Sequence, residues 1–213
     1  MLSRIHCLLG RISFGILLLG IALSSRSIPA IAQSSVKTAI DANQIIKNAF
    51  YDVSIYHPLG CAGNVGRLLE KLSFVLDISK LKVMFLLYEN GYSAGIPLKL
   101  KLKPYSVREY IAVWNYHAVI LSQNYIVDLH SKPFPLSARN YFAQHFPEGP
   151  GTERWKKIMV QIFPADKYLS AFLELQKKAP LEIDHTIGAA YLNRPSTAES
   201  PILSVADLLK FYK

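Results

Sequence analysis

The sequence predicts an α+β fold, in which helices and an antiparallel sheet occupy separate stretches of the chain. Helical patterns come first and several strand patterns then follow one another, an element order typical of this class. The 213 residues are 51% hydrophobic and 18% charged, so the chain can build a sizeable core and wholesale disorder is disfavoured. The length suits one domain or two small ones.

Residues 1–32 have the features of a secretory signal and stand apart from the fold. Arg4 and Arg11 give a positively charged start, an apolar run of twelve residues follows at 12–23, and an Ala-Ile-Ala motif at 30–32 is a small-x-small cleavage pattern. The run is shorter than the roughly 20 residues that span a bilayer, which disfavours the alternative of an uncleaved membrane anchor. We therefore expect an exported protein, periplasmic or secreted, without stable membrane insertion.

Cleavage before Gln33 is expected to leave one domain, residues 33–213. It removes three arginines and no acidic residue, so the formal net charge falls from +9 to +6, which favours acidic partners without identifying any. It also removes Cys7 and leaves Cys61 as the only cysteine. One cysteine makes no internal disulfide, so in an oxidising compartment its thiol is either buried and inert or kept for chemistry.

The first elements of this domain are predicted helices. Apolar residues at helical spacing predict a helix over Val36–Asn48. Tyr51–Gly60 is irregular because it contains proline and glycine. The broad apolar face of Asn64–Leu76 predicts the strongest helix in the chain.

The middle of the chain predicts strands. Lys82–Tyr88 contains an unbroken apolar run at 83–87, as in a buried strand. In Pro97–Lys103 leucines alternate with lysines, which predicts a half-exposed strand or, alternatively, a basic strip that binds an acidic partner. Val113–Leu121 and Tyr125–Leu129 are joined by the polar residues 122–124 and predict an antiparallel hairpin.

The last third adds a strand and two helices. Lys157–Phe163 predicts a strand, and Pro164–Ala179 predicts a helix because it starts with proline and ends in lysines. Pro180–Pro201 reads as a long loop. Ser204–Phe211 predicts a short helix that its serine caps.

Cys61 follows a glycine-containing loop and precedes the strongest predicted helix, a position that suits a nucleophile. A helix N-terminus carries partial positive charge and free N–H groups, which favour a thiolate and can stabilise an oxyanion. The predicted hairpin would bring His117 and Asp128 together, so that the carboxylate orients the imidazole. The three residues then fit the Cys-His-Asp logic of cysteine hydrolases. Each residue also has a purely structural interpretation: Cys61 as an inert core thiol, His117 as a hydrogen-bonded histidine in a strand, and Asp128 as a residue that ends a strand and starts a turn.

A zinc site is the rival interpretation of the same residue types. His57, Cys61, His117 and His130 offer suitable ligand atoms, but their spacing matches no compact zinc signature and only one is a thiolate. No phosphate-binding glycine loop is present, and only the modest positive charge favours nucleic acid. We predict no metal, no other cofactor and no nucleic-acid partner.

Four ordered segments carry a resemblance to a known family. They are C-A-G-N-V-G-R-L at 61–68, W-N-Y-H-A-V-I-L at 114–121, V-D-L followed by P-F-P within 127–135, and P-A-D-K-Y-L-S-A-F at 164–172. Together they resemble the protein N-terminal glutamine amidohydrolase family over about residues 56–175.

The resemblance implies a papain-like fold, in which an antiparallel sheet packs against a helix that carries the nucleophile at its N-terminus. It implies that Cys61 is the nucleophile, His117 the acid and base, and Asp128 the orienting group. It further implies hydrolysis of a glutamine side chain to glutamate, with release of ammonia through a thioester and without a cofactor. The candidate substrate-binding residues are Tyr56, Asn64, Asn115 and Tyr116.

The substrate remains open between N-terminal and internal glutamine. The family has acidic residues after its cysteine and before its tyrosine-histidine pair, where this chain has Ala62, Gly63 and Asn115. Carboxylates would be the natural complement of an N-terminal ammonium group. A cysteine peptidase or acyl transferase with the same triad, and an inactive binding module, are the alternatives. We expect a monomer whose partner is a glutamine-bearing protein or peptide.

Overall fold

The structure, a computed structural model, describes residues 44–49, 57, 60–88, 98–102, 110–130, 135–146, 151–192 and 194–212. The predicted signal, most of the predicted helix over Val36–Asn48, and Tyr56 lie outside these residues. The described part of that helix, 44–48, is helical, and the helix continues to residue 49. Within the described residues, no helix combines the length and apolarity needed to cross a membrane.

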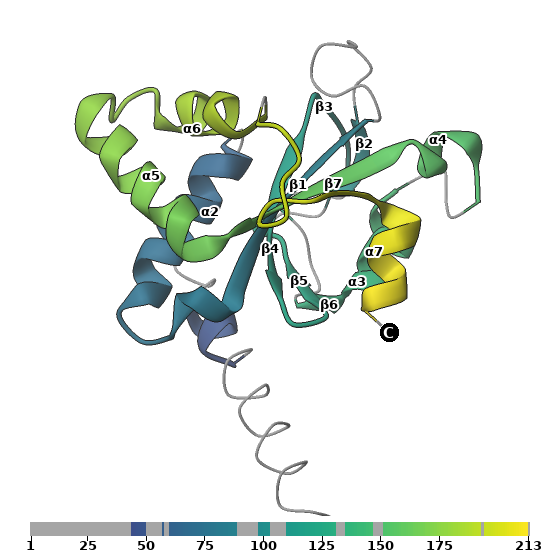
Figure 1. The fold of residues 1–213 in the computed structure, drawn as a ribbon, viewed down its shortest axis with the longest axis horizontal. Helices are drawn as coiled ribbons and strands as arrows, with labels where there is room; N and C mark the ends of the chain where they lie inside the picture. Colours follow the sequence, from purple (N-terminus) through teal and green to yellow (C-terminus); the bar gives the residue numbers. More distant parts are fainter. Residues whose placement is uncertain are drawn as a thin grey trace, which may run out of the picture.

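A six-stranded sheet in the order β6-β5-β4-β1-β7-β8 forms the centre of the fold, and every strand pair in it is antiparallel (Figure 1). A second sheet pairs two further strands, also antiparallel. The antiparallel α+β class is therefore confirmed. The strands of the large sheet are β1 (Leu81–Tyr88), β4 (His117–Ser122), β5 (Tyr125–Val127), β6 (Leu136–Ser137), β7 (Ile158–Pro164) and β8 (Ile202–Ser204); those of the small sheet are β2 (Leu98–Leu102) and β3 (Tyr110–Trp114).

Helices cover both faces of the large sheet and create two cores (Figure 1). Along β1, Val83, Phe85 and Leu87 belong to one core, whereas Met84 and Leu86 belong to the other. This alternation explains why residues 83–87 of the strand are all apolar, since both of its faces are buried there. The first core lies under α2 (Cys61–Ser73), α5 (Ala165–Lys178) and α6 (Ile183–Leu192). The second core lies under α3 (Ala138–His145) and α7 (Val205–Phe211). Two short elements, η2 (Ile78–Lys80) and α4 (Glu153–Lys156), are single turns.

Helix α2 begins three residues earlier than the sequence predicts. Gly60 is its N-cap and accepts a hydrogen bond from the Asn64 backbone N–H at 2.7 Å, so Cys61 is the first helical residue. At the other end, α2 stops at Ser73, and Val75, which was predicted to lie on its apolar face, is exposed. After Ser73 the chain turns towards η2 and β1, and the helix ends there.

The predicted strand over Val113–Leu121 is wrong as a single element. It is broken by a bend at Asn115 and Tyr116, so that β3 pairs with β2 in the small sheet while β4 pairs with β1 and β5 in the large one. The predicted hairpin between β4 and β5 is confirmed, with Gln123 at a left-handed φ of 56° in its turn. His117 consequently begins β4 instead of lying in mid-strand.

The predicted loop over Pro180–Pro201 is also wrong in part, because it contains α6 and borders β8. Ile183, Ile187 and Tyr191 are buried at a spacing of four residues, which places one face of α6 on the first core. The predicted strand β7 and helices α5 and α7 are confirmed, and Ser204 caps α7 by accepting the Asp207 backbone N–H at 3.0 Å.

Candidate functional site

Cys61 lies where the N-terminus of α2 meets the large sheet. It is the first residue of the helix, is 5% exposed, and belongs to the first core. The first N–H groups of a helix have no partner within the helix, and here Gly60 provides no side-chain cap for them. The first turn also contains no acidic residue of its own. A negative charge on the sulfur or on a bound carbonyl oxygen would therefore be stabilised at this helix end.

His117 and Asp128 form a buried pair at the open end of the hairpin, opposite the turn that joins the two strands carrying them. The Nε2 atom of His117 lies 2.9 Å from Oδ2 of Asp128, and the side chains are 0% and 2% exposed. His117 begins β4 and Asp128 follows β5, so the antiparallel register of these strands brings them together. The contact predicted from the sequence is confirmed.

The charges around His117 favour its protonated form. Burial lowers the pKa of His117, but the Asp128 carboxylate and the Cys61 thiol outweigh this effect and raise the pKa to about 10. Burial likewise raises the pKa of Asp128, yet the neighbouring charges of His117, His130 and His145 hold it well below its ordinary value. At neutral pH the pair is thus an imidazolium and a carboxylate.

The second ring nitrogen of His117 is available to the thiol. Nδ1 is buried, and no group that the structure describes lies within the distance and angle of a hydrogen bond to it. Cys61 is close enough to favour the imidazolium both as a hydrogen-bonding group and as a charge. With Nε2 committed to Asp128, Nδ1 is the nitrogen that can exchange a proton with the sulfur.

The Asp128 carboxylate is held by three donors. Oδ2 accepts hydrogen bonds from His117 and, at 2.8 Å, from the Tyr141 hydroxyl of α3, while Oδ1 accepts the His130 backbone N–H at 2.8 Å. Burial, followed by the Asp128 charge, raises the pKa of Tyr141 well above its ordinary value, so its hydroxyl remains a donor. Tyr141 was not identified from the sequence, because nothing local marks a core tyrosine as a partner of a distant carboxylate.

The Trp114 ring packs against His117 and the neighbouring His130. The Trp114 ring centroid lies 4.8 Å from that of His117 and 5.0 Å from that of His130. An aromatic ring beside an imidazolium excludes water and interacts favourably with the cation. The bend after β3 therefore places Trp114, the first residue of the W-N-Y-H-A-V-I-L segment, directly against His117.

The same cluster is the one group in the described part of the chain whose atoms are placed to hold a metal ion. His117, Asp128 and His130 each offer an atom within 4.8 Å of the others. Nitrogen and oxygen donors of this kind suit zinc. However, both Asp128 oxygens already accept hydrogen bonds from protein donors, so a hydrogen-bonded network accounts for the cluster. His57, a member of the zinc set considered from the sequence, pairs elsewhere with Asp184.

The chain matches no protein-family model, and no curated protein matches it significantly. The chemistry of the site and the four resembling segments therefore carry the functional inference.

The predicted substrate-binding residues have varied surroundings. The side chain of Asn64 is tied to the backbone of His57, since Oδ1 accepts the His57 N–H and Nδ2 donates to the His57 carbonyl, both at 2.8 Å. Its oxygen also accepts a hydrogen bond from Arg67, so the observed contacts of Asn64 are internal ones that hold the loop before Cys61. Asn115 is exposed in the bend, and Tyr116 is half-buried with its ring stacked on Phe85 at 5.7 Å.

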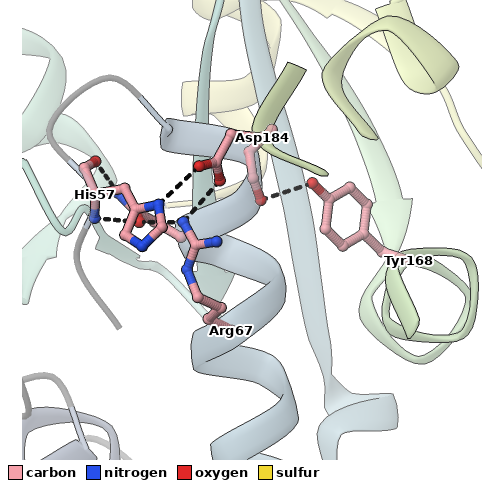
Figure 2. A network of polar contacts seen from close by, with 6 residues as sticks. His57, Arg67, Tyr168 and Asp184 are labelled. Atoms are coloured by element: carbon pink, nitrogen blue, oxygen red, sulfur yellow. Dashed lines mark hydrogen bonds and ion pairs between the residues drawn. The ribbon is translucent and has the colours of Figure 1, made fainter. Parts of the chain in front are cut away.

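A second polar network, missed by the sequence analysis, surrounds the start of α2 (Figure 2). Asp184 of α6 accepts a hydrogen bond from Arg67 Nη2 at 2.7 Å through Oδ1 and lies 2.9 Å from His57 Nδ1 through Oδ2. On the neighbouring side, the Tyr168 hydroxyl of α5 donates to the Ala62 carbonyl at 2.9 Å. These partners lie more than 100 residues apart, so no local pattern predicts them.

Proposed function

We propose that this protein is an exported cysteine amidohydrolase that converts a glutamine side chain of a protein or peptide to glutamate. The observation that carries the proposal is the buried His117, which has the Asp128 carboxylate at one nitrogen and the Cys61 thiol beside its ring. We further propose a papain-like arrangement, in which a helix presents the nucleophile to an antiparallel sheet that carries the histidine and the acid.

The first half-reaction is acylation of Cys61. The thiol proton resides on His117, and the thiolate attacks the carbonyl carbon of the glutamine amide. The carbonyl oxygen gains a negative charge, which the free N–H groups of the first turn of α2 are placed to stabilise. The intermediate collapses with cleavage of the carbon–nitrogen bond, His117 protonates the departing nitrogen, and ammonia leaves a thioester on Cys61.

The second half-reaction is hydrolysis of this thioester. His117, now neutral, removes a proton from a water molecule that attacks the thioester carbonyl. Cleavage of the carbon–sulfur bond releases glutamate, and the sulfur leaves as a thiolate beside the regenerated imidazolium. Asp128 keeps one imidazole tautomer throughout, because its Oδ2 atom accepts the Nε2–H group in both half-reactions.

The choice of glutamine rests on the four resembling segments, whose described residues contact one another in two pairs. The cysteine and P-A-D segments meet through the hydrogen bond from Tyr168 to Ala62 and through Gly66, where a side chain would collide with the Phe172 ring. The histidine and acid segments meet through the buried ion pair. Residues that a family shares for one chemistry are expected to gather in this way, which favours the family's reaction over other thioester chemistry.

Ammonia release from glutamine peptides tests the proposal. The purified protein is incubated with peptides that carry an N-terminal or an internal glutamine, and the products are identified by mass spectrometry. We expect ammonia in equal amount to the glutamate formed, with intact peptide backbones. Cys61→Ala abolishes the reaction, whereas Glu199→Gln, the control that removes a surface ion pair with Lys167, leaves the rate unchanged.

Other outcomes identify the alternatives. Backbone cleavage indicates a peptidase, and transfer of the glutamyl group to an added amine in preference to water indicates an acyl transferase. Absence of any reaction indicates a binding module. Loss of activity with a chelator, restored by zinc, would assign His117, Asp128 and His130 to a metal centre and contradict the thioester mechanism.

A further inference from the structure

Asp184 provides the acidic group that the first turn of α2 itself lacks. Its carboxylate is 29% exposed and bridges two residues on either side of Cys61, namely His57 in the preceding segment and Arg67 in the second turn of α2. Figure 2 shows both partners converging on the carboxylate from the loop and the helix. Asp184 thereby ties the chain before the nucleophile to the helix after it.

The backbone of α2 leaves room for this carboxylate. A Cβ atom added to Gly60 would lie 2.5 Å from the Asp184 carboxyl carbon, and one added to Gly63 would overlap the Oδ1 atom. Alanine is normally favoured over glycine inside a helix by about 0.5–1 kcal/mol, so a glycine at position 63 has a cost that needs a reason. The contact with Asp184 provides that reason.

We propose that Asp184 is a positioning residue for Cys61, which fixes the start of α2 through His57, Arg67 and its contact with Gly63. This inference rests on the proposed role of Cys61 as the nucleophile. Because both carboxylate oxygens of Asp184 have partners within the protein, its task is to hold the helix start and not to bind the substrate. Displacement of the carboxylate shifts the sulfur relative to His117 and slows attack by the thiolate.

The rate at which iodoacetamide alkylates Cys61 tests this role independently of any substrate. The measurements use the full chain with Cys7→Ser, so that Cys61 is the single thiol. We expect Asp184→Asn, which keeps the shape and removes the charge, to lower the alkylation rate about tenfold. Deamidation should show the same fall in kcat with KM little changed. Glu199→Gln, which removes a surface ion pair with Lys167 at 2.6 Å, is the matched control and leaves both rates unchanged.

A double-mutant cycle between Gly63 and Asp184 tests the contact itself. Gly63→Ala alone should lower the alkylation rate about tenfold, because the new methyl group displaces the carboxylate. In an Asp184→Ala background the methyl group has room, so Gly63→Ala should cause no further loss and should raise the melting temperature. Gly66→Ala, which meets Phe172 instead, should cause the same change with and without Asp184.

Three results would overturn the proposal. The first is an unchanged alkylation rate in folded Asp184→Asn, and the second is additivity between Gly63→Ala and Asp184→Ala. The third is an increase in KM alone, which would make Asp184 a substrate-binding residue. If Asp184→Ala does not fold, Asp184→Asn and Gly63→Ala still decide the question. If no glutamine peptide reacts but the coupling in alkylation is present, the proposed function fails and the positioning role stands.

Discussion

Replacement of Asp128 by asparagine is the perturbation that most sharply separates a catalytic pair from a structural one. The carboxylate accepts three hydrogen bonds, from His117 and Tyr141 at Oδ2 and from the His130 backbone at Oδ1. Asparagine has one acceptor oxygen and an NH2 group in their place. In either orientation the NH2 group faces at least one of these buried donors, so a hydrogen bond is lost while the shape of the side chain is kept.

The size of the effect follows from these contacts. A buried donor left without its partner costs about 1–3 kcal/mol of the free energy of unfolding. The carboxylate charge that counteracts burial is also removed, so the pKa of His117 falls from about 10 towards or below its ordinary 6.5. The imidazolium is then largely absent at neutral pH, and kcat/KM for deamidation should fall by about 10²–10⁴.

Steady-state deamidation across the pH range is the assay. In the wild type, activity should fall at alkaline pH near the pKa of about 10, because neutral His117 no longer protonates the departing ammonia. Asp128→Asn should move this alkaline limb to lower pH as well as reducing its height. An Asp128→Asn variant that is folded and keeps the wild-type rate and pH profile would refute the orienting role of the carboxylate.

Three further changes have defined outcomes. Tyr141→Phe removes one hydrogen bond to the Asp128 carboxylate, so chemical denaturation should show a loss of about 1.5–3 kcal/mol, with a fall in kcat smaller than that of Asp128→Asn. Asn64→Ala releases the backbone of His57 and should lower the melting temperature while KM stays unchanged; a raised KM with unchanged stability would restore Asn64 as a substrate-binding residue. The ion pair should also make stability depend on pH. The raised pKa of His117 gives stability that is complete below about pH 6.5 and disappears as the pH rises through about 10. The lowered pKa of Asp128 gives stability that is present above about pH 4 and is lost as the pH falls. A free energy of unfolding that stays constant from pH 4 to 10 would contradict the ion pair.

The elements that the sequence predicted are those whose apolar pattern is set by local packing. The apolar face of α2 and the apolar run of β1 are visible because each meets one or both cores along its length. The contact between His117 and Asp128 was predictable for a related reason. Two strands joined by a short polar turn pair with each other, and the register follows from the turn.

The elements that were missed depend on distant partners. Val113–Leu121 is apolar enough to be one strand, and only the separate pairing of β3 with β2 and of β4 with β1 breaks it at Asn115. Helix α6 lies between two prolines, and its buried residues form a recognisable face only when α2 and α5 provide a surface for them. Asp184 was missed for the same reason, since Arg67 lies 117 residues away from it.

Trapping of the acyl-enzyme with hydroxylamine tests the central claim most directly, because this nucleophile competes with water for a thioester on Cys61. We predict that a glutamine peptide and the wild-type protein yield the glutamyl hydroxamate at the expense of glutamate, and that Cys61→Ala yields neither product. Glutamate formation without any hydroxamate, or an active Cys61→Ala variant, would contradict it.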